Sequence, residues 1–121
     1  MDIAPAASKE GSAVIDITSI YPNKFLEALD QQKLKDSIII DVRELHEWEF
    51  YHLEEAQLIP MQQIPHRMGE LPDDRDIYIV CAHGVRSYRV AEYLLANGFE
   101  RVINVDGGMA AVAMLRGFQY D

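Results

Sequence analysis

Cysteine is almost absent from this chain: Cys81 is the only one in 121 residues. A lone cysteine excludes an internal disulfide framework and is typical of a reducing compartment, so we expect a cytoplasmic location. Long apolar runs are also missing, since none approaches the roughly 18 residues that a membrane-spanning helix needs. Residues 1–12 lack the basic-then-apolar pattern of a secretion signal, so we do not expect secretion.

Positive charge is scarce as well. Eleven lysines and arginines stand against 20 aspartates and glutamates, and the formal net charge is −9. This balance argues against binding to nucleic acid or to a membrane surface. A site for an anionic substrate would therefore have to create positive potential locally, because the rest of the chain opposes it.

The length fits one domain, and 49% of the residues are hydrophobic, which is typical of soluble globular chains. We expect a flexible N-terminal tail over residues 1–12 and a single domain over residues 13–121. Strand-like and helix-like segments alternate in that domain, which favours an α/β fold around a mostly parallel sheet. The expected strands cover residues 14–17, 37–42, 56–59, 76–80 and 101–105. The expected helices begin at Pro22 or cover residues 44–50, 61–71, 87–97 and 109–115.

The segment after the fourth expected strand carries most of the candidate chemistry. Cys81 ends this strand, and ligands of parallel sheets bind beyond the carboxyl ends of the strands. Backbone N–H groups of a strand-to-helix turn converge on one point, and the helix N-terminus adds positive potential that stabilises a thiolate. Gly84 permits the positive φ that such a turn needs, and Arg86 offers a planar charged fork for an oxyanion. Ser87 is expected to cap the helix through its hydroxyl.

We therefore predict Cys81 as a nucleophile, with a small anion as its substrate. The predicted substrate-binding residues are Ala82, His83, Gly84, Val85, Arg86 and Ser87. Ordinary structural explanations stay open for single residues. A free cysteine is often an inert core residue, Arg86 alone fits a surface salt bridge, and Ser87 alone fits a helix cap.

Four segments, in a set order along the chain, carry recognisable motifs. They are Asp41 to Glu44 (D-V-R-E); Glu47 to Pro60, through Glu47, His52, Ala56, Ile59 and Pro60; Cys81 to Ser87 (C-A-H-G-V-R-S); and Asn104 to Met109 (N-V-D-G-G-M). Together they resemble the rhodanese homology domain family over residues 38–117. The third segment matches the C-x-x-G-x-R-S active-site loop of that family.

This resemblance implies a three-layer α/β domain with a central, mostly parallel five-stranded sheet flanked by helices. It also implies a thiosulfate sulfurtransferase-type enzyme without a cofactor, in which Cys81 takes a sulfane sulfur from a small anionic donor and becomes a persulfide. Cyanide or a thiol, including a protein thiol, would then accept the sulfur. Arg86 would hold the oxyanion end of the donor, while Asp41, Arg43 and His52 would support the site structurally.

Some residues depart from the family pattern or invite another interpretation. Tyr51 stands where the family usually has a glycine, and Gln119 stands where it usually has a proline. The four histidines lack compact metal-ligand spacing, so we expect no metal site. They are His46, His52, His66 and His83.

Two other functions compete with a free-standing sulfurtransferase. Cysteine phosphatases and arsenate reductases use a related loop, but resemblance to the phosphatases would require five residues between cysteine and arginine. Only four residues separate Cys81 from Arg86, which favours sulfur donors. The second alternative is a persulfide carrier or docking module that another protein loads with sulfur.

Overall fold

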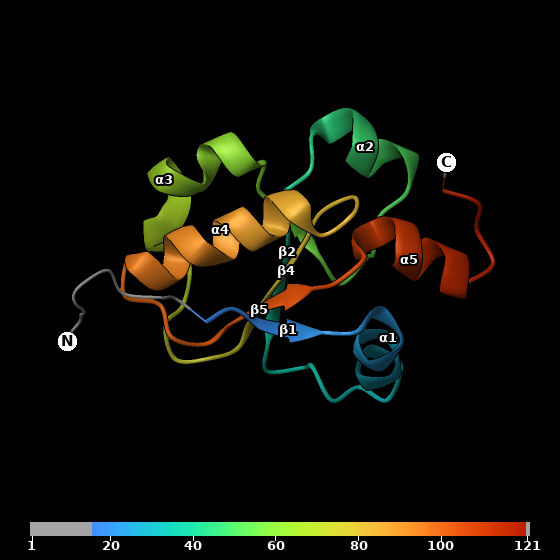
Figure 1. The fold of residues 1–121 in the computed structure, drawn as a ribbon, viewed down its shortest axis with the longest axis horizontal. Coiled ribbons are helices and arrows are strands. Elements are labelled where there is room, and N and C mark those ends of the chain that lie inside the picture. The colour runs from blue at the N-terminus through green and yellow to red at the C-terminus, as the bar shows by residue number, and fades with distance from the viewer. Residues whose placement is uncertain (1–15, 121) are drawn as a thin grey trace.

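The computed structural model describes residues 16–120 of the chain, in which strands and helices alternate (Figure 1). The strands are β1 (Thr18–Ile20), β2 (Ile38–Asp41), β3 (Gln57–Leu58), β4 (Ile77–Val80) and β5 (Val102–Val105). The α-helices are α1 (Pro22–Asp30), α2 (Leu45–Phe50), α3 (Ile64–Arg67), α4 (Val85–Ala96) and α5 (Gly108–Leu115). Two short 3₁₀ turns, η1 (Met61–Gln63) and η2 (Met68–Glu70), flank α3.

The five strands form one sheet in the order β1-β5-β4-β2-β3, and every neighbouring pair is parallel. The central strand β4 pairs with β5 on one side and with β2 on the other. The predicted α/β fold with a five-stranded sheet is thus confirmed, and the sheet is parallel throughout the described residues. All five carboxyl ends therefore point toward the same edge of the sheet.

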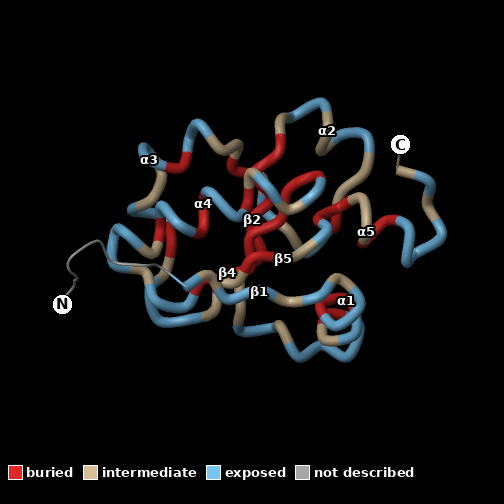
Figure 2. Tube along the Cα trace, in the orientation of Figure 1, coloured by how far each residue is buried: buried red, intermediate tan, exposed pale blue. Residues whose placement is uncertain are grey.

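Side chains alternate between the two faces of β4 and feed two separate hydrophobic clusters. Ile77 and Ile79 belong to a cluster that α3 and α4 cover, whereas Tyr78 and Val80 belong to one that α1 and α5 cover. Figure 2 shows the buried stretches along the central strands between these helices. A strand buried on both faces needs a continuous apolar run, which I-Y-I-V supplies. The domain accordingly has three layers.

Several predicted boundaries differ from the structure. The first strand lies at Thr18–Ile20 rather than at 14–17; residues 14 and 15 fall outside the described part, as does the tail predicted for 1–12. Pairing with β5, not local propensity, defines this short edge strand. The helix predicted over 61–71 is split into η1, α3 and η2, and Pro65 occupies the first turn of α3, where its missing N–H costs nothing.

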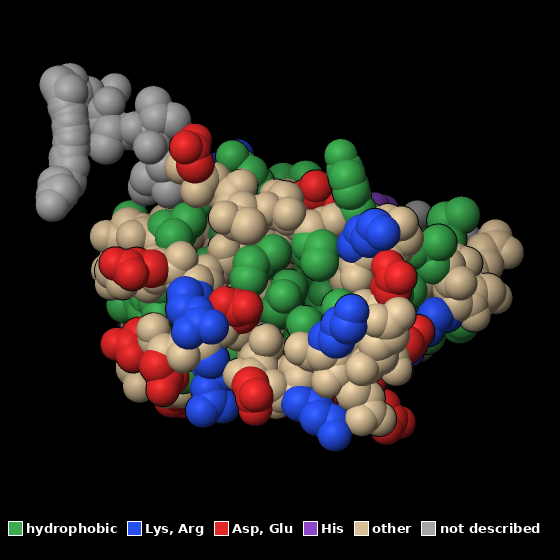
Figure 3. All heavy atoms as spheres, turned by 90° about the horizontal axis from the view of Figure 1, so that it is seen from below, with side chains coloured by type: hydrophobic (Ala, Val, Ile, Leu, Met, Phe, Trp, Pro, Cys, Tyr) green, Lys and Arg blue, Asp and Glu red, His purple; other side chains and the backbone are tan. Residues whose placement is uncertain are grey.

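The surface carries charges of both signs. Figure 3, seen from below the view of Figure 1, shows acidic and basic side chains interspersed around a central group of hydrophobic ones. None of the helices in the described part is long and apolar enough to cross a bilayer.

Candidate active site

Three neighbouring strands deliver polar side chains to the carboxyl edge of the sheet. Asp41 ends β2, Cys81 follows β4, and Asn104 lies near the end of β5. All three residues are at most 2% exposed. Cys81 therefore sits at the base of the predicted site, where a parallel sheet commonly places its ligands.

The Cys81 loop, defined as residues 81–87, wraps around the cysteine sulfur. Gly84 has φ 93°, a left-handed conformation that favours glycine, and it forms the N-cap of α4. Its backbone N–H donates to Cys81 Sγ at 3.1 Å, and the Ser87 hydroxyl lies 3.3 Å from the same sulfur. The first-turn N–H groups of the 12-residue helix α4 have no intrahelical acceptors. This end of the helix therefore supplies both hydrogen bonds and positive potential to a thiolate.

Ser87 is not the helix cap that we predicted. Because α4 begins at Val85, Ser87 lies inside its first turn and is fully buried. The hydroxyl is 2.5 Å from Asn104 Oδ1 and faces Cys81 Sγ on its other side. The left-handed Gly84 starts the helix two residues earlier than the sequence pattern indicates, and it turns Ser87 toward the sulfur.

A second helix N-terminus holds the other side of the loop. Met109 N–H donates to the Cys81 carbonyl at 2.7 Å, and Ala110 N–H donates to the Ala82 carbonyl at 2.9 Å. Gly108 makes this approach possible, since a Cβ there would lie 2.6 Å from the Ala82 carbonyl carbon. The double glycine thus lets α5 bind the loop carbonyls, while the Gly84 N–H faces the sulfur.

Asn104 is a buried link between the loop and the start of α5. Its side-chain N–H groups lie within hydrogen-bond distance of Asp106 Oδ1 (3.2 Å) and the Gly84 carbonyl (3.4 Å). Its oxygen accepts from Ser87. The Asp106 contact orients the amide so that its oxygen faces the serine, and this holds the hydroxyl that contacts Cys81.

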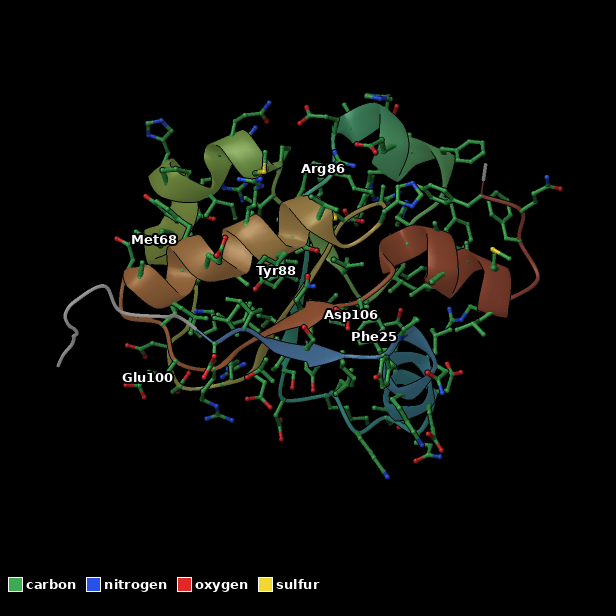
Figure 4. The ribbon with its side chains drawn as sticks, in the orientation of Figure 1. Phe25, Met68, Arg86, Tyr88, Glu100 and Asp106 are labelled. Carbon is green, nitrogen blue, oxygen red and sulfur yellow. The ribbon has the colours of Figure 1, made fainter. Side chains whose placement is uncertain are left out.

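Arg86 does not present a free fork to the site. Its two terminal nitrogens donate to the two carboxylate oxygens of Glu47 in α2, each at 2.8 Å. Figure 4 shows Arg86 between α4 and α2. These hydrogen bonds lower the pKa of Glu47 to about 2 and raise the pKa of Arg86 further above its ordinary value. Electrostatic interaction with Cys81 also raises the pKa of Arg86.

Arg43 forms a second ion pair just after the end of β2, and it is completely buried. Its guanidinium binds Asp41 through two nitrogens, with Nη2 to Oδ2 at 2.8 Å. It also donates to the carbonyls of Glu47 and Tyr51 and to the Tyr120 hydroxyl. Although burial opposes the charge, the contacts with Asp41 and Tyr120 raise the pKa of Arg43 overall. The pair therefore joins β2, α2 and the C-terminal segment.

The two candidate histidines lie in different surroundings. His52 stacks on Trp48, with ring centroids 3.9 Å apart, and its Nδ1 lies 2.7 Å from the Trp48 carbonyl, contacts that fasten the end of α2. His83 is exposed on the loop, and its ring meets Tyr120 edge-on at 6.2 Å. Of the other loop residues, Ala82 is buried and Val85 is 65% exposed. Within residues 16–120, no cluster of metal-ligating side chains occurs.

Sequence reasoning assigned no role to three residues that contact the site. Glu47, Asn104 and Tyr120 contact Arg86, Ser87 and Arg43, respectively. Glu47 and Asn104 lie within the motifs quoted for the family, so position in a motif was a usable signal. Tyr120 had none, because only the folding of the C-terminal segment against α2 brings it near the loop.

Comparison with known sequences finds relatives that are named as sulfurtransferases or as a sulfur carrier. The profile of the family described as "Rhodanese-like domain" matches residues 21–115. A "Sulfurtransferase" of Allochromatium vinosum is 39% identical over 89 residues, which cover 72% of this chain and 83% of that protein. A "Thiosulfate sulfurtransferase GlpE" of Pseudoalteromonas translucida is 37% identical, with 71% of this chain and 79% of that protein covered.

A further relative and a solved structure extend this comparison. The "Putative sulfur carrier protein YrkF" of Bacillus subtilis is 37% identical over 84% of this chain, and the match spans only 56% of that longer protein. The crystal structure of a "Rhodanese-like Domain Protein" from Staphylococcus aureus superposes with a TM-score of 0.73 at 40% identity. That match covers 79% of this chain and 91% of the other.

Proposed function

We propose, from the premise that this chain belongs to the rhodanese-like domain family, that it transfers sulfane sulfur through a persulfide on Cys81. One observation carries the proposal. The sulfur of Cys81 is held by the Gly84 N–H and the Ser87 hydroxyl at the N-terminus of α4. Such donors stabilise a thiolate and, after transfer, the anion of a persulfide.

The first half-reaction loads the cysteine. The Cys81 thiolate attacks the outer sulfur of a donor such as thiosulfate, a new S–S bond forms, and the bond between the two donor sulfurs breaks. The bonding electron pair leaves with sulfite, and the terminal sulfur remains on Cys81. Because Cys81 is only 1% exposed, the donor has to present a narrow sulfur end to the loop.

The second half-reaction unloads the sulfur. An acceptor thiolate or cyanide attacks the terminal sulfur, the S–S bond to Cys81 breaks, and the electron pair returns to the cysteine as a thiolate. The Gly84 N–H and the Ser87 hydroxyl, which stabilise the starting thiolate, stabilise the same thiolate as the leaving group here. The same hydrogen-bond donors thus stabilise Cys81 both as nucleophile and as leaving group, as expected for two-step covalent catalysis.

A carrier function is the second candidate, and similarity to a putative sulfur carrier protein favours it. A carrier would be loaded by a partner protein, and it would react slowly with free thiosulfate. The chemistry at Cys81 is the same in both cases. The two functions differ in which donor gives the faster loading.

Turnover with thiosulfate and with an alkyl persulfide tests the proposal. We expect sulfur transfer to cyanide or a thiol by the wild-type protein and none by Cys81→Ser. Serine is nearly the same size as cysteine, so the stability of Cys81→Ser should stay close to wild type. Measuring that stability checks that a loss of activity does not come from unfolding. Hydrolysis of an aryl phosphate without sulfur transfer from any donor would overturn the proposal in favour of a phosphatase. Slow thiosulfate turnover with fast loading by a cysteine desulfurase would assign the carrier function.

A further inference from the structure

Arg86, in the Cys81 loop, and Arg43, which contacts the neighbouring helix α2, are each already bound to a carboxylate. Arg43 is fully buried and uses its guanidinium on Asp41, two backbone carbonyls and Tyr120. Arg86 uses both terminal nitrogens on Glu47. The positive charge of Arg86 is therefore offset by the negative charge of Glu47. The formal net charge of the whole chain is −9, so the chain as a whole adds no positive charge.

Glu47 is held in place independently of Arg86. As the third residue of α2 it completes a capping box, in which its Oε1 accepts the backbone N–H of Glu44 at 2.9 Å. Its side chain is 20% exposed. With a pKa of about 2, it is ionised at any neutral pH. Glu47 is thus a fixed negative charge paired with Arg86, the arginine of the Cys81 loop.

A fixed carboxylate on Arg86 affects sulfur donors unequally. Thiosulfate is a dianion, so its oxyanion end meets a guanidinium whose charge Glu47 offsets, and it also meets the carboxylate itself. A donor R–S–SH has no oxyanion group. When the Cys81 thiolate attacks its outer sulfur, a new S–S bond forms, the S–S bond of the donor breaks, the SH group moves to Cys81 and R–S⁻ leaves. Charges a few ångströms apart in a partly buried site interact strongly enough to change a rate constant about tenfold. The electrostatic effect of Glu47 is therefore strong enough to set a preference between these donors.

We propose that Glu47 is a specificity-determining residue that selects against dianionic donors and in favour of persulfide donors without an oxyanion group. This inference rests on the proposed sulfur transfer through Cys81. The sequence predicted that Arg86 binds the oxyanion end of the donor. In the structure both terminal nitrogens of Arg86 bind Glu47 instead, so the inference assigns Arg86 a different role. The variant Glu47→Gln restores binding of the oxyanion end, since a glutamine keeps the cap on Glu44 and removes the charge.

The experiment measures the rate constant for single-turnover loading of Cys81 by mass spectrometry, with thiosulfate and with 2-hydroxyethyl persulfide. For Glu47→Gln we expect loading from thiosulfate to rise about tenfold and loading from the persulfide to stay within about twofold. Glu49→Gln is the matched control, because Glu49 is an exposed residue of the same helix and the charge change is the same. It should leave both rates within about twofold of wild type.

Arg86→Ala and the double variant Glu47→Gln/Arg86→Ala separate Glu47 from Arg86. Arg86→Ala leaves the carboxylate unpaired and should slow thiosulfate loading about tenfold. The double variant, like wild type, has no net charge at the pair, so its thiosulfate rate should return close to the wild-type value. A double variant as slow as Arg86→Ala, or an unchanged Glu47→Gln, would overturn the inference. Absence of sulfur on Cys81 with either donor would instead refute the proposed function.

Discussion

Two arginine–carboxylate pairs contact helix α2 near the Cys81 loop, and they differ in exposure and in the number of partners. The Asp41–Arg43 pair is 0% exposed, and Arg43 has three partners besides Asp41. The Glu47–Arg86 pair is 20% and 33% exposed, and Arg86 contacts the single carboxylate of Glu47. Removing one partner of a fully buried ion pair destabilises a protein strongly, whereas a change in a partly exposed pair has a smaller effect on stability. The first pair is therefore suited to hold the fold, and the second to tune chemistry.

The largest expected effect comes from removing the buried arginine. Arg43→Met leaves Asp41 as an unpaired buried charge and should lower the free energy of unfolding by about 3–5 kcal/mol. Urea denaturation measures this loss. Arg101→Met is the control, because Arg101 pairs with Asp76 at the surface, and the loss there should stay below about 1 kcal/mol. If Arg43→Met and Arg101→Met lost equal free energies of unfolding, the Asp41–Arg43 pair would be no more important for stability than a surface pair.

A smaller change removes one partner of Arg43 and keeps the aromatic packing. Tyr120→Phe deletes the hydroxyl that accepts from Arg43 at 3.0 Å, and it should cost about 1 kcal/mol of stability while the loading rate of Cys81 stays unchanged. Tyr21→Phe, in a residue that is 70% exposed, is the matched control and should cost nothing measurable. Slower loading in Tyr120→Phe with wild-type stability would place Tyr120 in the chemistry instead.

The smallest expected effect is the acid dependence of the Glu47–Arg86 pair. The folded-state pKa of Glu47 is about 2, against an ordinary value of 4.5, because Arg86 donates hydrogen bonds to the carboxylate. A depressed pKa contributes stability that is fully present above pH 4.5 and is lost as the pH falls toward 2. The stability difference between wild type and Glu47→Gln should shrink over this range, as followed by thermal unfolding at several pH values. A difference that grows on acidification would contradict the assigned pair.

The sequence allowed prediction of those features that depend on local pattern. The I-Y-I-V run, the glycine at 84 and the alternation of strands and helices were sufficient for a parallel sheet with Cys81 at a carboxyl end. The partner of Arg86 was out of reach, because Glu47 lies 39 residues earlier and only the packing of α2 against α4 brings the two together. Ser87 was placed wrongly because a left-handed Gly84 moves the start of α4 by two residues.

The central claim, that the Cys81 loop carries sulfane sulfur, is tested most directly by intact mass spectrometry. The protein is exposed to a sulfane donor, freed of excess donor and then treated with an acceptor thiol. We predict the gain of one sulfur atom, its location on the peptide that contains Cys81, and its loss after the acceptor is added. A Cys81 that stays unmodified with thiosulfate, with an alkyl persulfide and with a cysteine desulfurase would contradict the claim.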